Sequence, residues 1–369
     1  MGEQVTPILR DSKTMFDGKR ILVTGGTGSL GKALTRRLLS GRHGYPESVT
    51  VFSRDEAKQY EMRLLFSGLV ATSEDVIYSD HKKILRFRIG DVRDFRAVQM
   101  ALRNTDIVFN AAALKQVPNC EYFPGEAIET NIGGPLNITR AIAVNNLPIE
   151  AVIGISTDKA CYPVNVMGMT KALQERIFIS ASLELRHTRL ICARYGNVLS
   201  SRGSVIPLFH SQIKAGGPVT ITTSRMTRYF LSLEQACDTV IGTYRLGCSG
   251  DIIVPRLPSL QIQLLAECLI GDRKIEINEI GIRPGEKIHE ILITEDEAGR
   301  AVESEDYYLI RPSLPELQDG LTDRPAITSE YSSRSNHMSR DQLMAMLKRH
   351  RLFIEDAPDF RDVFGRVFE

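Results

Sequence analysis

A carboxylic acid and an amine stand side by side at Asp158 and Lys159 in the stretch STDK, and a second lysine follows at Lys171. Such groups can give and take protons, which is the chemistry of general acid–base catalysis. The stretch follows the β-rich run AVIGIS (151–156), and open α/β folds bind ligands at the carboxyl ends of their strands. The pair is therefore a candidate catalytic centre; the alternative is an exposed ion pair beside a solvated lysine.

Alternating β-rich and helix-like segments must position this pair. The expected strands are Arg20–Thr24, Ser48–Ser53, Ile84–Gly90, Asp106–Ala112, Ala151–Ser156 and Arg189–Gly196, and the first expected helices are Leu30–Ser40 and Asp55–Phe66. This alternation predicts an α/β fold of the Rossmann type, a doubly wound parallel sheet covered by helices on both faces.

Pro and Gly become frequent after Gly196, which predicts a smaller C-terminal substrate domain interleaved with the last elements of the sheet. The expected nucleotide-binding domain comprises residues 16–200 and 233–272. Residues 201–232 and 273–318 are expected to form the substrate domain, and residues 319–369 a tail with one late helix.

The stretch TGGTGSLG (24–31) follows the first expected strand and opens a helix. Its glycines, Gly25, Gly28 and Gly31, allow a backbone to approach a pyrophosphate at a helix N-terminus. Thr27, Ser29 and Leu30 complete this expected phosphate-binding turn. An ordinary tight turn is the alternative, although its place between strand and helix favours a dinucleotide.

Residues after the next strands extend the expected cofactor site. Arg54 and Lys58 follow the second strand, where an arginine suits the 2′-phosphate of NADP better than the ribose of NAD; a solvated helix start is the alternative. Asp91 and Val92 are expected near the adenine. Ala111 and Ala112 are small enough to admit the cofactor, or they simply begin a helix.

Composition excludes several classes of function. Lys plus Arg is 46 and Asp plus Glu is 45, which gives no electrostatic case for nucleic acid or a membrane surface as the main partner. The sequence has no run of 18 consecutive apolar residues, so no membrane span is expected. The scattered cysteines lack a CxxC pair and predict reduced thiols in a cytoplasmic protein. No metal-ligand spacing is present, and His210 and His289 are expected to be packed or surface residues.

Taken together, the motifs TGGTGSLG, FSRDEAKQYEMR, GDVRDF, AAALKQVP, STDKA, RYGNVLSSRGSVIPLF, MTRYFLSL and RPGEK resemble the extended short-chain dehydrogenase/reductase superfamily. More narrowly, they resemble the UDP-N-acetylglucosamine 4,6-dehydratases that invert C5, in the branch used for capsule and O-antigen sugars. The resemblance covers about Phe16 to Pro312 and, weakly, the tail SEYSSRSNHMSRDQLMAML. That branch has methionine where the superfamily has tyrosine, so Met167 matches it.

The resemblance implies a catalytic cycle on UDP-N-acetylglucosamine. Oxidation at C4 acidifies the C5 proton, water is lost across C5 and C6, and hydride returns to C6. Asp158 and Lys159 are the implied acid and base, with Thr157 and Met167 beside them and Lys171 on the nicotinamide ribose. A cation about 6 Å from Lys159 would lower its pKa by roughly two units at an effective dielectric near 20. Three acceptors for the C4 hydroxyl proton stay open: a water held by Lys171, Thr157, or Asp158.

The resemblance also implies the remaining ligand contacts. Lys115 and Asn131 are expected at the cofactor, and Lys115 also at the substrate. The further expected substrate residues are Val117, Asn197, Arg202, Ser204, Val205, Arg228, Arg283 and Glu286. Tyr307 and Tyr308 either stack on the uracil or pack in the core. Relatives form dimers or hexamers, so a homo-oligomer is expected. A C5-retaining dehydratase, a 4-epimerase and a non-catalytic NADP-binding protein are the alternative functions.

Overall fold

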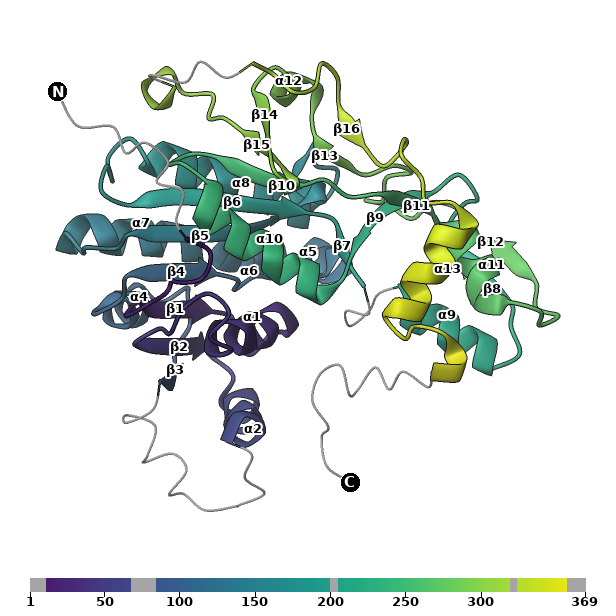
Figure 1. Ribbon diagram of the computed structural model, residues 1–369, viewed down its shortest axis with the longest axis horizontal. Helices are drawn as coiled ribbons and strands as arrows, with labels where there is room; N and C mark the ends of the chain where they lie inside the picture. The colour runs from purple at the N-terminus through teal and green to yellow at the C-terminus, as the bar shows by residue number, and fades with distance from the viewer. Residues whose placement is uncertain (1–10, 68–83, 200–204, 319–323, 357–369) are drawn as a thin grey trace.

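The computed structural model describes residues 11–67, 84–199, 205–318 and 324–356. A central sheet runs through the molecule in the strand order β14-β15-β10-β6-β5-β4-β1-β2-β3 (Figure 1). The strands from β3 to β10 in this order are parallel, whereas β15 and β14 add to the β10 edge in antiparallel fashion. The expected doubly wound Rossmann-type sheet is confirmed.

The strands begin and end as follows: β1 (Arg20–Thr24), β2 (Ser48–Ser53), β3 (Leu85–Ile89), β4 (Ile107–Asn110), β5 (Ala151–Thr157), β6 (Arg189–Tyr195), β7 (Asn197–Val198), β8 (Val219–Ile221), β9 (Thr227–Leu231), β10 (Ile252–Pro255), β11 (Ser259–Gln261), β12 (Ile277–Glu279), β13 (Ile291–Ile293), β14 (Ala301–Ser304), β15 (Tyr307–Ile310) and β16 (Tyr331–Ser332). The expected strands of the sheet agree with these bounds to within two residues.

The helices are α1 (Ser29–Leu39), α2 (Glu56–Ser67), α4 (Phe95–Leu102), α5 (Val117–Tyr122), α6 (Pro124–Ile128), α7 (Gly134–Asn145), α8 (Val166–Ala181), α9 (Val205–Lys214), α10 (Leu233–Leu246), α11 (Ile262–Ile270), α12 (Glu295–Ala298) and α13 (Arg340–Arg349). A π-helical turn, η2 (Glu129–Gly133), precedes α7, and short 3₁₀ turns are η3 (Asp158–Ala160), η4 (Pro315–Leu317) and η5 (Ile354–Asp356).

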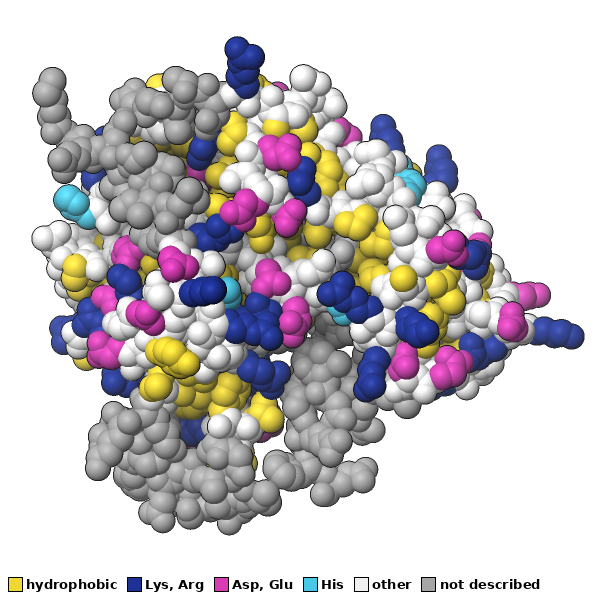
Figure 2. Space-filling view, viewed as in Figure 1, with side chains coloured by type: hydrophobic (Ala, Val, Ile, Leu, Met, Phe, Trp, Pro, Cys, Tyr) yellow, Lys and Arg dark blue, Asp and Glu magenta, His cyan; other side chains and the backbone are white. Residues whose placement is uncertain are grey.

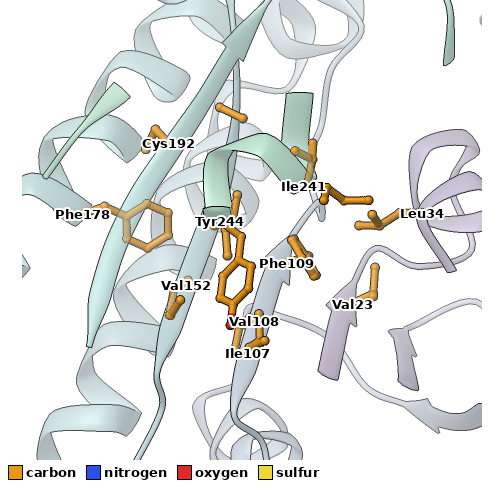
Figure 3. Close-up of a cluster of buried hydrophobic side chains, with 14 of the residues drawn as sticks. Val23, Leu34, Ile107, Val108, Phe109, Val152, Phe178, Cys192, Ile241 and Tyr244 are labelled. Carbon is orange, nitrogen blue, oxygen red and sulfur yellow. The ribbon is translucent and has the colours of Figure 1, made fainter. Parts of the chain in front are cut away.

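Helices cover both faces of the sheet, which is why its inner strands read as continuous apolar runs. Helix α1 packs against α10 on one face, while α4, α7 and α8 pack together on the other. Phe109 on β4, Val152 on β5 and Tyr244 on α10 belong to the main core that results (Figure 3). This rigid sheet fixes the positions of the loops at its carboxyl edge.

A second core lies beside the sheet (Figure 1) and combines α9, α11, α13 and the β8–β12 pair. Phe209, Leu265 and Leu343 are buried in it. Leu343 lies on α13 in the expected tail, so this late helix is an integral part of the second unit.

The domain boundaries therefore differ from the expected ones in two places. Helix α11, expected in the nucleotide-binding domain, packs in the second core. Strands β14 and β15, expected in the substrate domain, extend the central sheet. Apolar patterns identify the elements, but they do not say which of two cores an apolar face joins.

Positive and negative side chains are interspersed on the face drawn in Figure 2, in line with the balanced composition. None of the described helices is both long and apolar enough to cross a membrane.

A buried ion network ties the sheet to the segment near β13. The Arg194 guanidinium on β6 donates to Glu175 Oε2 on α8 at 2.7 Å and to both Glu297 oxygens on α12 at 2.7 and 2.8 Å. Burial disfavours ionisation of Glu297, but the Arg194 charge outweighs it and lowers the pKa of Glu297 to about 2. Ser156, two residues before Asp158, donates to Glu175, so the network also anchors the end of β5.

Replacing Arg194 with Met should lower the free energy of unfolding by about 3–5 kcal/mol, because two buried carboxylates lose their cation. Urea unfolding at neutral pH measures the loss. In the wild type the Glu297 contribution is present above the unfolded carboxyl pKa of about 4.3 and should fade as the pH falls toward 2. The control is Arg256→Met, which removes an exposed pair with Glu303 and should change stability by less than about 1 kcal/mol. Equal losses in the two variants would contradict this account.

Candidate active site

The glycine turn packs against the end of β4. Gly25 has a φ of +62°, and a Cβ there would lie 2.7 Å from the Ala112 backbone. A Cβ on Gly31 would lie 2.5 Å from Gly26 Cα. The first position therefore requires glycine for both conformation and space, and the second for space alone. Ala111 and Ala112 thus lie against the turn.

No capping side chain occupies the free backbone N–H groups at the N-terminus of α1. Gly28 is its N-cap without a side-chain hydrogen bond, Ser29 and Leu30 begin the helix, and no acid lies in the first turn. Its backbone N–H groups and the positive end of its dipole suit a phosphate group. Thr27 Oγ1 lies 2.8 Å from Ser53 Oγ, which links the turn to the end of β2.

Charged residues line the ends of β2 and β3. Arg54 is exposed, and its guanidinium lies 3.6 Å from Asp91 Oδ2. Lys58 donates to Asp55. Asp91 accepts hydrogen bonds from Arg93, whose charge outweighs burial and lowers the pKa of the Asp91 carboxyl. Val92 beside it is buried. Arg54 thus lies just after β2, with its exposed side chain paired with a carboxylate of the loop after β3.

Asn131 joins the loop after β4 to helix α8. Its side chain accepts from Leu114 N at 2.8 Å and donates to Leu114 O and Thr170 Oγ1 at 2.9 and 3.0 Å. These bonds use the donors and acceptor of this fully buried amide, so Asn131 shapes the loop. Lys115 next in the loop is exposed, and Val117 begins α5.

Asp158 and Lys159 form the expected pair, and the structure adds a third group. Lys159 Nζ lies 3.1 Å from Asp158 Oδ1 and 3.1 Å from Glu290 Oε1. Asp158 and Glu290 are buried, whereas 22% of the Lys159 side chain is exposed. Thr157 Oγ1 donates to Asp158 Oδ1 at 2.9 Å. The Lys159 side chain is therefore the partly exposed member of the cluster, and the half-buried Thr157 residue lies beside Asp158.

Burial and neighbouring charges set the protonation of this cluster. Burial raises the pKa of Asp158, which favours its protonated form. Burial alone would lower the pKa of Lys159, but Asp158 and Glu290 outweigh it and the pKa is raised. The expected lowering of the Lys159 pKa by a cation about 6 Å away stays a prediction; in the protein by itself, the charges of Asp158 and Glu290 outweigh burial and Arg228.

Lys171 on α8 is buried and donates to Ile155 O at 2.8 Å and Gln174 Oε1 at 2.9 Å. Burial lowers its pKa to about 8. Met167, one turn earlier, is buried with Cys120 and Ala127 in a small apolar cluster. The thioether thus occupies space without offering a proton, whereas Lys171 and Glu175 are ionisable groups that this helix brings to the end of β5.

Two glycines allow the surrounding elements to meet the pair. A Cβ on Gly168 would lie 2.2 Å from Lys159 O, so only glycine lets α8 start this close to η3. A Cβ on Gly196 would lie 2.7 Å from Tyr229 Cβ and 3.4 Å from Asp158 Oδ2. Asn165 caps α8 and also donates to Gly285 O at 2.9 Å, which joins the site to the RPGEK segment.

The expected substrate residues divide into three groups. Arg202 and Ser204 lie outside the described residues. Val205 begins α9, Arg283 is exposed, and Glu286 accepts from Thr222 Oγ1 at 3.4 Å. Asn197 Oδ1 is buried without a hydrogen-bond partner in the described chain, which makes it available to a ligand.

Arg228 is buried and donates to the carbonyls of Thr227, Ile288 and Lys287. These hydrogen bonds hold the segment that carries Glu290. Sequence reasoning missed Glu290; the only signal was its place three residues after Lys287 in RPGEKIHE.

The tyrosine and histidine side chains considered above make contacts within the protein itself. Tyr308 packs edge-on against Tyr331 at a centroid distance of 5.3 Å, and the Tyr307 hydroxyl donates to Asp238 O. These contacts favour packing over uracil stacking. His210 is buried in the second unit, and His289 Nδ1 lies 2.8 Å from Thr227 Oγ1. Within the described ranges, no cluster of His, Cys, Asp and Glu could hold a metal ion.

These residues fit a nicotinamide dinucleotide. At Gly25 the turn presents bare backbone packed against Ala112. A side chain in this turn would block the approach of a pyrophosphate. Asn110 Nδ2, at the end of β4, is buried and lacks a hydrogen-bond partner among the described residues. The ends of β1, β4 and β5 lie at one edge because these strands are parallel and in register, from Thr24 through Asn110 to Gly154. The turn and the Asp158–Lys159 pair therefore share one edge of the sheet.

Comparison with known proteins agrees with this architecture. A family model described as "Polysaccharide biosynthesis protein" matches residues 21–312. The chain is 42% identical over 303 residues to a UDP-N-acetylglucosamine 4,6-dehydratase (inverting) of Campylobacter jejuni, covering 81% of this chain and 85% of that protein. It is 45% identical over 302 residues to a UDP-glucose 4-epimerase of Rickettsia conorii, covering 80% and 84%.

Solved structures give the same fold. The structure of Pen from Bacillus thuringiensis matches with a TM-score of 0.80 and 33% identity, over 92% of this chain and 100% of that one. The dTDP-glucose 4,6-dehydratase DesIV of Streptomyces venezuelae matches with a TM-score of 0.61 and 19% identity, over 90% and 97%, which supports the fold alone.

The fold and the site together define an extended short-chain dehydrogenase/reductase. Within that class, the chain belongs to the polysaccharide biosynthesis protein family, whose members compared above are nucleotide-sugar dehydratases and epimerases.

Replacing Gly25 with Ala should weaken binding of a nicotinamide dinucleotide by at least tenfold, because the new methyl group meets the Ala112 backbone and the positive φ is strained. Fluorescence titration with the reduced cofactor measures the affinity. The matched control is Gly299→Ala, where a Cβ meets nothing within 4 Å. Unchanged affinity in the Gly25 variant would show that the turn does not hold the cofactor.

Proposed function

We propose that the protein is an NADP-dependent UDP-N-acetylglucosamine 4,6-dehydratase that inverts C5, acting in polysaccharide biosynthesis. The observation that carries the proposal is the buried carboxyl of Asp158 paired with the amine of Lys159, whose side chain is partly exposed, at the carboxyl edge of the sheet. A dehydratase needs an acid for the leaving hydroxyl and a base for the C5 proton. These two groups supply both.

A bound nicotinamide ring supplies hydride chemistry, taking hydride from C4 of the sugar and returning it at C6. The chain's own residues handle the protons. Asp158 receives the C4 hydroxyl proton through Thr157, whose hydroxyl donates to it. Lys159 in its neutral form takes the C5 proton, which the C4 ketone has acidified. Asp158 then gives its proton to the C6 oxygen, so that water leaves and Asp158 is again ionised.

Neutral Lys159 arises when its ammonium loses a proton to solvent, because Asp158 is to take the C4 hydroxyl proton. Burial raises the pKa of Asp158 and so favours its protonated form once that proton has arrived. The amine and the carboxylic acid are then present together, which is the state that elimination requires. A proton from solvent, added to C5 on the face opposite the lost proton, then inverts that carbon.

NADP is proposed over NAD because Arg54 is exposed at the end of β2 and suits a 2′-phosphate. Lys171 is proposed to hold the nicotinamide ribose. Substrate diphosphate is proposed to bind near Asn197 and Arg283.

A homo-oligomer is proposed because α7 and α8 expose Leu136, Val144, Met169 and Leu173. The surface beside them is hollowed by a cavity of about 520 Å³ between α7 and the end of α8. Sedimentation of the purified protein tests this: a monomer at micromolar concentration would exclude it.

A UDP-sugar 4-epimerase is the second candidate, because relatives of equal similarity carry that name. An epimerase needs no base at C5 and no acid at O6. The Asp158–Lys159 pair therefore favours the dehydratase.

Incubation of the protein and NADP⁺ with UDP-N-acetylglucosamine should give a UDP-4-keto-6-deoxy sugar with the inverted C5 configuration, seen by NMR. Asp158→Asn should reduce formation of the 4-keto sugar by about 10²-fold or more, because the C4 hydroxyl proton loses its acceptor. Formation of the ketone and NADPH by Asp158→Asn at the normal rate would refute the role of Asp158. A product that keeps its 6-hydroxyl and differs only at C4 would identify an epimerase.

Arg54→Ala should weaken NADP⁺ binding by about tenfold or more while changing NAD⁺ binding little, because only NADP⁺ carries the 2′-phosphate. Titration with both cofactors measures this ratio. Tighter binding of NAD⁺ than NADP⁺ by the wild type would instead assign NAD.

A further inference from the structure

Glu290 is the second carboxylate that contacts Lys159, and it lies far from Asp158 along the chain. Its Oε1 lies 3.1 Å from Lys159 Nζ and 3.5 Å from Arg228 Nε. Its side chain is buried, and Oε2 has no hydrogen-bond partner within the described residues. A buried carboxylate is retained only where cations compensate it. Here the compensating cations are the lysine of the proposed site and a buried arginine.

The C-terminal segment holds Glu290 in place. The Glu290 amide donates to Ser333 Oγ at 2.9 Å, and Ser333 N donates back to Glu290 O at 2.8 Å. Ser333 Oγ also lies 2.7 Å from Thr227 Oγ1, next to Arg228. The tail motif SEYSSRS therefore has a structural role, because its Ser333 fixes the backbone that carries Glu290.

We propose that Glu290 is a positioning residue for the reaction, which holds the Lys159 amino group beside Asp158 and stabilises its protonated form between turnovers. This inference rests on the proposed function of Lys159 as the base. Glu290 itself does not touch the reacting atoms; it acts through the lysine.

Four charged groups face Lys159: Asp158 at the end of β5, Glu290 before β13, Arg228 on β9, and Lys287 in the RPGEK segment. The carboxylates favour the ammonium, and the two cations oppose it. Neutralising Glu290 removes one of the two favourable charges at 3.1 Å while both opposing cations stay. Lys159 should then lose its proton at lower pH.

The test measures the ionisation of Lys159 directly. Competitive acetylation of the full-length protein with acetic anhydride over a pH series, read by peptide mass spectrometry, gives the pKa of that one lysine. Glu290→Gln should lower it by about one to two units. The limb of the kcat/KM pH profile that reports the base should move to lower pH by the same amount. At a fixed alkaline pH, kcat should fall while KM changes little, because the lysine is misplaced.

Glu290→Asp provides the second variant, since it keeps the charge and withdraws it by one methylene. Its Lys159 should show a smaller shift than in Glu290→Gln, and part of the kcat should return. This variant also keeps a partner for Arg228 if the glutamine variant does not fold. The control is Glu303→Gln, which removes an exposed carboxylate paired with Arg256 and should leave Lys159 unchanged.

An unchanged Lys159 pKa in both Glu290 variants would overturn the inference. The acetylation readout needs no substrate, so it separates this outcome from failure of the proposed function. If UDP-N-acetylglucosamine is not turned over but the lysine still shifts, the function is wrong and the contact between Glu290 and Lys159 stands.

Discussion

The Lys159 ammonium lies between two buried carboxylates that come from distant parts of the chain. Asp158 follows β5 of the central sheet, and Glu290 precedes β13, whose Leu292 and Ile293 pack in the main core. Their common cation therefore joins the end of β5 to the segment that also carries the RPGEK motif. A lone buried carboxylate at either place would be strongly unfavourable. The cluster thus links the placement of the β13 segment on the sheet to the protonation state of the proposed base.

Glycines make this arrangement sterically possible. Gly168 lets α8 begin against the Lys159 carbonyl, and Gly196 lets β6 end against Tyr229 and Asp158. Met167 fits the same picture, because a methionine at this buried position fills space and leaves proton transfer to other groups. With the phenol absent, the path from Thr157 to Asp158 is the direct proton route out of the buried pair that the described residues provide.

Much of this fold could be predicted from local sequence patterns. The strands of the sheet, the glycine turn and the Asp158–Lys159 pair depend on nearby residues, and periodicity and turn chemistry report on those. Glu290 could not be predicted this way, because its role depends on a contact with a residue far away in the sequence. The same holds for α11 and α13, whose apolar faces signal burial without naming the core they join. The raised pKa of Lys159 depends on the adjacent Asp158 and on Glu290, and only the first of these is visible in the local sequence.

The central claim is that the amine of Lys159 removes the proton from C5 of the sugar. The most direct measurement follows deuterium from D₂O into C5 during turnover of UDP-N-acetylglucosamine, in the wild type and in Lys159→Met that still binds the cofactor. The account predicts that the wild type incorporates deuterium at C5, whereas the variant oxidises C4, accumulates reduced cofactor and incorporates none. Incorporation at C5 by the variant at the wild-type rate would contradict it.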